Sequence, residues 1–251
     1  HPEFAAHLPV ENYYRDLSKM FRKEPLGPVA ARINYYDNGV RQADAMIESI
    51  LQILKNKGYL EKALVVITAD HGESLGEHQR YGHVEGVFEP MLHIPLLFQR
   101  IGFAGTPVSA FRNGPNSQVD VAPTIMQELG LPSPATWQGT ALQKKLAKDQ
   151  QFLFFEQQHE HGLLDWQTPG NIWKYWRHAL TLNEHAFELV SDPLEAHDQM
   201  PVLGETLKRQ WRRLLTPLQA KAVELKKAEE LPQLAPSSSS TAIKANQTSP
   251  E

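Results

Sequence analysis

The sequence predicts an α/β fold: a mostly parallel sheet flanked by helices, with a small antiparallel subdomain after about residue 150. Three observations lead to this prediction. An amphipathic helix pattern covers residues 28–57. The apolar, β-branched run at residues 64–68 is typical of a strand buried in a parallel sheet. Residues 173–182 alternate bulky and smaller side chains, which favours an antiparallel strand.

Glycines mark the ends of the predicted helices. In the first helix, apolar residues recur at steps of three or four, and Gly58 supplies a stop. A second apolar strand is expected at residues 94–98, after a polar loop. Asp120 is expected to cap a short helix that Gly130 ends.

The last hundred residues predict a smaller unit and a tail. An apolar strand is expected at 152–155, and a helix rich in Leu, Lys and Arg at 203–228, with a break near Pro217. Pro, Ser, Thr and Ala then dominate, which predicts disorder. The expected organisation is an α/β part over 1–150, a subdomain with its closing helix over 151–228 and a disordered tail over 229–251.

Composition excludes several classes of protein. The chain has 251 residues, a net charge of −4 and no cysteine, so general affinity for nucleic acid is not expected and disulfides and thiolate zinc sites are excluded. No apolar run approaches the roughly 18 residues that span a bilayer. A hydrophobic content of 41% is enough for a core.

The candidate site follows the strand at 64–68, where the sequence continues Ala-Asp-His-Gly-Glu. Ligands of open α/β sheets bind at the carboxyl ends of strands. Asp70 and His71 occupy that position, and a carboxylate beside an imidazole is a common metal-binding pair. His83 follows twelve residues later, far enough for the loop to fold back over the same site.

Each candidate also has a structural interpretation. Asp70 could simply cap a turn, and His83 could be a surface histidine. Glu73 is interpreted as a residue that orients the loop by hydrogen bonds. The pair His159 and His161 suggests a second metal site, but such short tracts are more often solvated.

The string from 64 to 83 resembles the sulfatase branch of the alkaline phosphatase superfamily, with its "DHGE.LGE" and later His. Arylsulfatases, phosphoethanolamine transferases and lipoteichoic acid synthases share this pattern. The order and spacing of further segments agree with the resemblance. These segments are residues 36–44, 119–125, 137–142 and 187–195.

The resemblance implies roles for four residues. Asp70 and His71 would be ligands of a divalent metal ion, such as Ca, Mg, Mn or Zn. His83 would be catalytic and would bind the sulfate or phosphate group of the substrate. Lys174, in Trp-Lys-Tyr, resembles a family position in the small C-terminal sheet, from which it would reach the active site and bind the substrate.

The family's nucleophile is a Cys or Ser in sulfatases and a Thr in the transferases, and it lies early in the domain. No segment here matches it. The family's "H.P.(F/Y)" segment would fit Pro2 and Phe4, or else His7 and Pro9. We therefore expect the chain to be the C-terminal part of a larger enzyme whose N-terminal part is its partner, and to be inactive alone.

By this resemblance, the expected function is metal-dependent hydrolysis of a sulfate or phosphate ester. Two alternatives stay open: a phosphoethanolamine or phosphoglycerol transferase of the cell envelope, and a catalytically inactive module that binds a ligand. The substrate would be a small-molecule or lipid-headgroup ester. A periplasmic or other extracytoplasmic location is expected, with membrane anchoring through an N-terminal region.

Overall fold

The computed structural model describes residues 29–83, 86–103 and 111–229. The N-terminal matches at Pro2, Phe4 and His7 lie outside these residues, as does nearly all of the predicted tail at 229–251. The division into parts at residues 150 and 228 stays a prediction. Within the described ranges, no helix is both long enough and apolar enough to cross a membrane.

The first predicted helix is confirmed as α3 (Val29–Asn56). Its end is formed by Gly58, which has a φ of 78°, and by a bond from the Tyr59 N–H to the Leu54 carbonyl oxygen (3.0 Å). A positive φ costs glycine little, so Gly58 suits this position.

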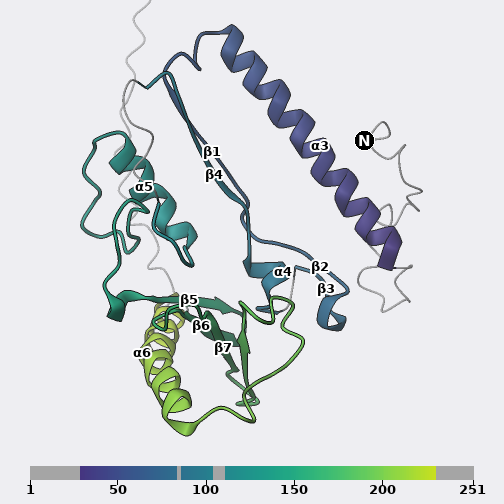
Figure 1. Cartoon of the computed structure of the whole chain (residues 1–251), viewed down its shortest axis with the longest axis vertical. Coiled ribbons are helices and arrows are strands. Elements are labelled where there is room, and N and C mark those ends of the chain that lie inside the picture. Colours follow the sequence, from purple (N-terminus) through teal and green to yellow (C-terminus); the bar gives the residue numbers. More distant parts are fainter. Residues whose placement is uncertain (1–28, 84–85, 104–110, 230–251) are drawn as a thin grey trace, which may run out of the picture.

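The strand predicted at 64–68 is β1 (Ala63–Thr68), and its partner is β4 (Leu96–Ile101). The two strands are antiparallel, with Ala63 opposite Ile101 and Thr68 opposite Leu96. In the view of Figure 1 this long pair lies between α3 and α5. The strand predicted at 94–98 corresponds to β4, which starts two residues later than predicted and ends three residues later.

A mostly parallel sheet is not confirmed, because all strand pairs among the described residues are antiparallel. The physical reason is that an apolar, β-branched run predicts a strand but carries no information on its partner or direction. Here the chain returns through the polar loop and runs back along β1.

The loop between β1 and β4 has its own short elements. A small hairpin is formed by β2 (Ser74–Leu75) and β3 (Tyr81–Gly82), with a 3₁₀ turn, η1 (Glu77–Gln79), between them. The helix α4 (Glu89–Leu92) follows. These elements fold the loop back over the end of β1.

The next helix, α5 (Val121–Glu128), starts after the 3₁₀ turn η2 (Gln118–Asp120). Asp120 lies at this start as predicted and is buried, but its carboxylate does not cap α5. It accepts hydrogen bonds from the N–H groups of Ser117 (3.1 Å) and Thr140 (2.7 Å) and pairs with Arg112. Asp120 therefore ties the turn to a later segment of the chain.

The predicted small antiparallel sheet is observed. It contains four strands in the order β5-β6-β7-β8 and follows the 3₁₀ turn η3 (Lys148–Gln150). The strands are β5 (Phe152–Gln157), β6 (Glu160–Asp165), β7 (Trp173–His178) and β8 (Glu184–Glu188). The helix α6 (Glu205–Glu229) lies against this sheet and continues through Pro217, where a break was expected (Figure 1).

Among the described residues, two apolar clusters pack against the C-terminal sheet. The first joins the sheet to α6 and is built on Leu163, Tyr175 and Trp211. The second joins the loop before α4 to the sheet through Val87, Phe88, Trp176 and Phe187. Because burial of apolar area is the main stabilising term, the second cluster fixes the loop region against the C-terminal sheet.

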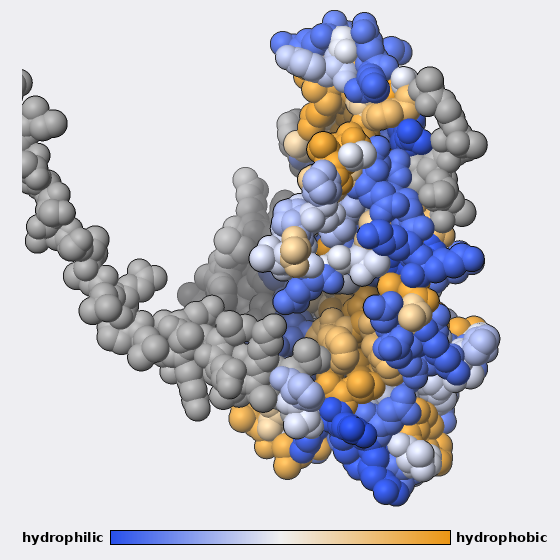
Figure 2. All heavy atoms as spheres, turned by 90° about the vertical axis from the view of Figure 1, so that its left-hand side faces the viewer, coloured by the Kyte–Doolittle hydropathy of each residue, from blue (hydrophilic) through white to orange (hydrophobic). Residues whose placement is uncertain are grey.

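Several large apolar side chains stay at the surface. On the face that lies to the left in Figure 1, hydrophobic patches lie among hydrophilic residues (Figure 2). Along α3 the exposed large hydrophobic residues are Ile33, Tyr35, Tyr36, Val40, Met46, Ile50 and Ile53. Exposed apolar surface of this kind often marks a site of interaction with another protein, a membrane or a ligand.

Candidate functional site

The Asp70–Glu73 loop is fixed by α4. The N–H groups of Gly72 and Glu73 donate to the carbonyl oxygens of Met91 (2.9 Å) and Pro90 (3.0 Å). A Cβ at position 72 would lie 1.9 Å from the Pro90 oxygen. Only glycine allows this close approach of two backbone segments.

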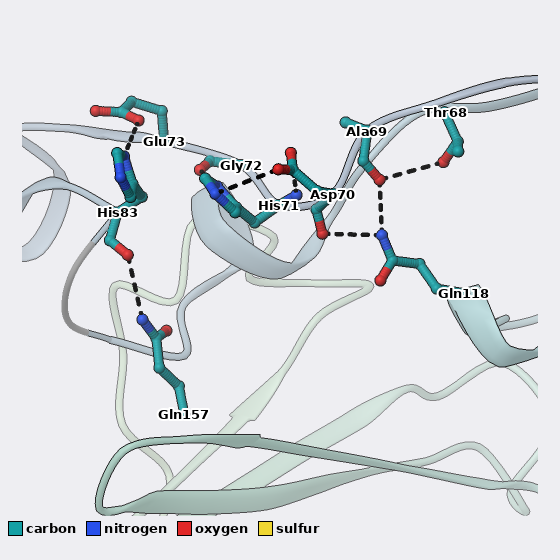
Figure 3. Close-up of polar contacts among 9 residues, drawn as sticks. All are labelled: Thr68, Ala69, Asp70, His71, Gly72, Glu73, His83, Gln118 and Gln157. Atoms are coloured by element: carbon teal, nitrogen blue, oxygen red, sulfur yellow. Dashed lines mark hydrogen bonds and ion pairs between the residues drawn. The ribbon is translucent and has the colours of Figure 1, made fainter. Parts of the chain in front are cut away.

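Gln118 holds the other side of the loop. Its amide nitrogen donates to the carbonyl oxygens of Ala69 (2.7 Å) and Asp70 (2.8 Å), which links η2 to the end of β1 (Figure 3). Sequence reasoning missed this residue. The only available signal was its position next to the family-like segment at 119–125.

The Asp70 carboxylate is held as an anion. One oxygen, Oδ1, accepts the N–H of His71 (2.9 Å). This backbone hydrogen bond is the main cause that lowers the pKa of Asp70 below its usual range. The other oxygen, Oδ2, lies 3.7 Å from His71 Nε2, and the Asp70 side chain is 87% exposed.

The His71 ring is oriented by the backbone. Its Nδ1 lies 2.9 Å from the Gly72 carbonyl oxygen. A carbonyl oxygen only accepts, so Nδ1 carries the proton and donates it. The lone pair of Nε2 then faces the Asp70 carboxylate, which is how metal-binding histidines are commonly prepared.

Asp70 and His71 therefore fit two positions of a metal shell, a hard oxygen and an imidazole nitrogen. Within the described ranges, no group of three or more His, Cys, Asp or Glu side chains is arranged to hold a metal ion. A complete shell would need ligands from elsewhere.

His83 lies beside this pair, because Ser74 pairs with Gly82 in the β2–β3 hairpin. The residues just outside that pair, Glu73 and His83, then meet. His83 Nδ1 lies 3.0 Å from Glu73 Oε2, and the His83 ring stacks on His71 with centroids 4.8 Å apart (Figure 3). Nε2 of His83 is thus the ring nitrogen left for a ligand, and Glu73 has the orienting role that the sequence suggested.

Lys174 has different surroundings. Its side chain is completely buried on β7, and its Nζ lies 2.8 Å from Glu195 Oε1 and 3.0 Å from Glu89 Oε1. Burial raises the pKa of the Glu195 carboxyl. The structure thus brings Asp70, His71 and His83 together and places Lys174 in a separate buried charge cluster.

Comparisons with known proteins identify the family of the chain. The sulfatase family model matches residues 5–131, just over half of the chain. Arylsulfatase K from Bos taurus is 27% identical over 201 residues, which cover 73% of this chain and 35% of that protein. A protein of Haloferax volcanii named low-salt glycan biosynthesis sulfotransferase is 34% identical over 122 residues, or 47% of this chain and 27% of that protein.

Among solved structures, a 2-O GAG sulfatase aligns with a TM-score of 0.46 and 19% identity, covering 66% of this chain and 38% of that one. The chain spans about a third of the length of the arylsulfatase relatives that it matches. The family match over residues 5–131 contains the loop with Asp70, His71 and His83. The chain therefore belongs to the sulfatase family of the alkaline phosphatase superfamily.

Proposed function

We propose that the protein hydrolyses a sulfate ester in a metal-dependent reaction, with a phosphate ester as the related alternative substrate. The observation that carries this proposal is the meeting of Asp70, His71 and His83 in one loop at the end of β1. A carboxylate and an imidazole that would hold a cation, with a second imidazole beside them, suit an anionic ester better than a neutral substrate.

In this proposal Asp70 and His71 hold a divalent cation such as Ca, Mg, Mn or Zn. A cation held there would supply a positive charge that stabilises the negative charge developing on the ester oxygens. His83 directs Nε2 at the substrate; with Nδ1–H donating to Glu73, a doubly protonated ring donates a proton or a hydrogen bond from Nε2 to a substrate oxygen. Glu73 keeps the His83 ring in place through Nδ1.

The substrate-binding role of Lys174 stays a prediction. Its ammonium group is buried between two carboxylates, and an anionic substrate would have to compete with both of them.

The test is sulfate release from an aryl sulfate by the larger protein of which we expect this chain to be a part, by its Asp70→Ala variant and by a His197→Ala control. The His197 side chain is 78% exposed and pairs weakly with Asp192, so the control changes a surface histidine alone. We expect Asp70→Ala to abolish release and His197→Ala to preserve it. Equal rates for all three proteins would exclude the proposed site, and no release by the wild type with any divalent cation would favour a binding module.

Group transfer is the second candidate, because one relative is named a sulfotransferase. A transferase of phosphoethanolamine or phosphoglycerol in the cell envelope would use the same loop with an alcohol acceptor in place of water. Adding an excess of a simple alcohol to the assay distinguishes the two: transfer yields the alcohol ester, whereas hydrolysis yields only the free anion.

We also propose that the chain acts as part of a larger, extracytoplasmic enzyme. Two facts support a missing partner segment: the relatives are much longer, and the apolar side chains along α3 are exposed. The nucleophile and the remaining metal ligands would come from that segment.

A further inference from the structure

A buried charge triad lies where the C-terminal sheet meets the loop region. It consists of Lys174 on β7, Glu195 in the segment after β8, and Glu89, the first residue of α4. The side chains of Lys174 and Glu195 are completely buried, and that of Glu89 is 21% exposed. Buried charges are costly unless they are paired, so each member depends on the other two.

The triad contacts the first residue of α4 at two points. Lys174 Nζ contacts the Glu89 side chain at 3.0 Å. The Glu89 backbone N–H donates to Glu195 Oε2 at 2.6 Å. Both contacts fix the helix at its first residue, on the side chain and on the backbone.

The next two residues of α4 bind the loop that contains the candidate site. The carbonyl oxygens of Pro90 and Met91 accept the N–H groups of Glu73 and Gly72. Those bonds hold the loop that presents Asp70, His71 and the His83 partner Glu73. The buried Lys174 is therefore connected to the candidate site in two steps: its ion pair with Glu89, and the backbone hydrogen bonds between α4 and the Asp70–Glu73 loop.

We propose that Lys174 is a positioning residue: through Glu89 and Glu195 it holds α4 where its carbonyl oxygens order the Asp70–Glu73 loop. The charge balance favours this role over direct contact with substrate. One ammonium already faces two carboxylates, so no positive charge is left over for an anionic ester. The activity readout below rests on the proposed function, whereas the exchange readout does not.

The test is amide hydrogen exchange of the Gly72 and Glu73 backbone in the full protein, comparing wild type with Lys174→Met and Glu89→Gln. Glu184→Gln is the matched control, since Glu184 on β8 also pairs with a cation, Arg212 on α6. We expect exchange at Gly72 and Glu73 to accelerate on the order of tenfold in both test variants and to stay unchanged in the control.

Kinetics separate positioning from substrate contact. A misplaced loop lowers kcat with little change in KM, whereas loss of a substrate contact raises KM. If Lys174→Met fails to fold, Glu89→Gln still tests the proposal, because it removes one charge and keeps the shape of the side chain. Unchanged loop exchange in Glu89→Gln overturns the proposal, whether or not the protein proves to be a sulfatase.

Discussion

At the scale of single residues, the candidate site depends on a glycine that has no chemistry of its own. Gly72 lies against the backbone of α4, and a Cβ there would come within 1.9 Å of the Pro90 oxygen. The Gly72→Ala variant must push the loop away from α4 and lose the bond to Met91. We expect a loss of roughly 1–3 kcal/mol in the free energy of unfolding, as for other overpacked positions.

The matched control is Gly39→Ala, on α3. A Cβ at position 39 meets nothing within 4 Å, and alanine is favoured over glycine in a helix by about 1 kcal/mol. Thermal unfolding of both variants checks the prediction: Gly72→Ala should melt below the wild type and Gly39→Ala at or above it. Equal melting temperatures for the two variants would refute the tight approach at position 72.

Much of the site could be predicted at this scale, and the rest could not. Asp70, His71 and His83 were identifiable because a recognisable string surrounds them, and they do meet in the structure. Gln118 was not, since a glutamine before a turn carries no sign of the distant carbonyl oxygens that it binds. Likewise, no local pattern shows that Lys174 will be buried between two glutamates.

At the scale of elements, helices and the C-terminal sheet were more predictable than strand pairing. The period of apolar residues and Gly58 defined α3 within one residue at each end. The direction of β1 against β4 was missed, because pairing is decided by tertiary contacts. Pro217 was expected to break α6, yet the described helix continues through it.

The packing of α6 on the C-terminal sheet gives a prediction about pH. Hydrogen bonds from Arg212, together with one from Tyr175, hold the pKa of Glu184 below its usual range. A carboxyl group with a lowered pKa in the fold stabilises the protein above its unfolded pKa, about 4.3. That contribution disappears as the pH falls through the lower, folded pKa.

We therefore expect Glu184→Gln to be less stable than the wild type at pH 7, by about 1–3 kcal/mol, and the difference to narrow near pH 3. Denaturant unfolding at both pH values measures it. Glu48→Gln, at an exposed position of α3, controls for the loss of one negative surface charge. A difference that is constant between pH 7 and pH 3 would contradict the assigned ion pair.

At the scale of the whole molecule, we expect the 251-residue chain alone to release no sulfate from aryl sulfates. We expect the family's nucleophile to lie outside these residues, and a metal-binding pair cannot replace the covalent step that a nucleophile supplies. Steady-state assays of the purified chain check this. Turnover that Asp70→Ala abolishes would show that the nucleophile lies within these residues.

The central claim is that Asp70 and His71 hold a metal ion while His83 acts on the substrate. In the intact protein, metal content and sulfate release measured on the same samples of His71→Ala and His83→Ala test it most directly. The account predicts that His71→Ala loses metal and activity together. It predicts that His83→Ala keeps its metal and loses about 100-fold or more in rate. A His83→Ala variant with near-normal rates, or a His71→Ala variant with full metal content, would contradict it.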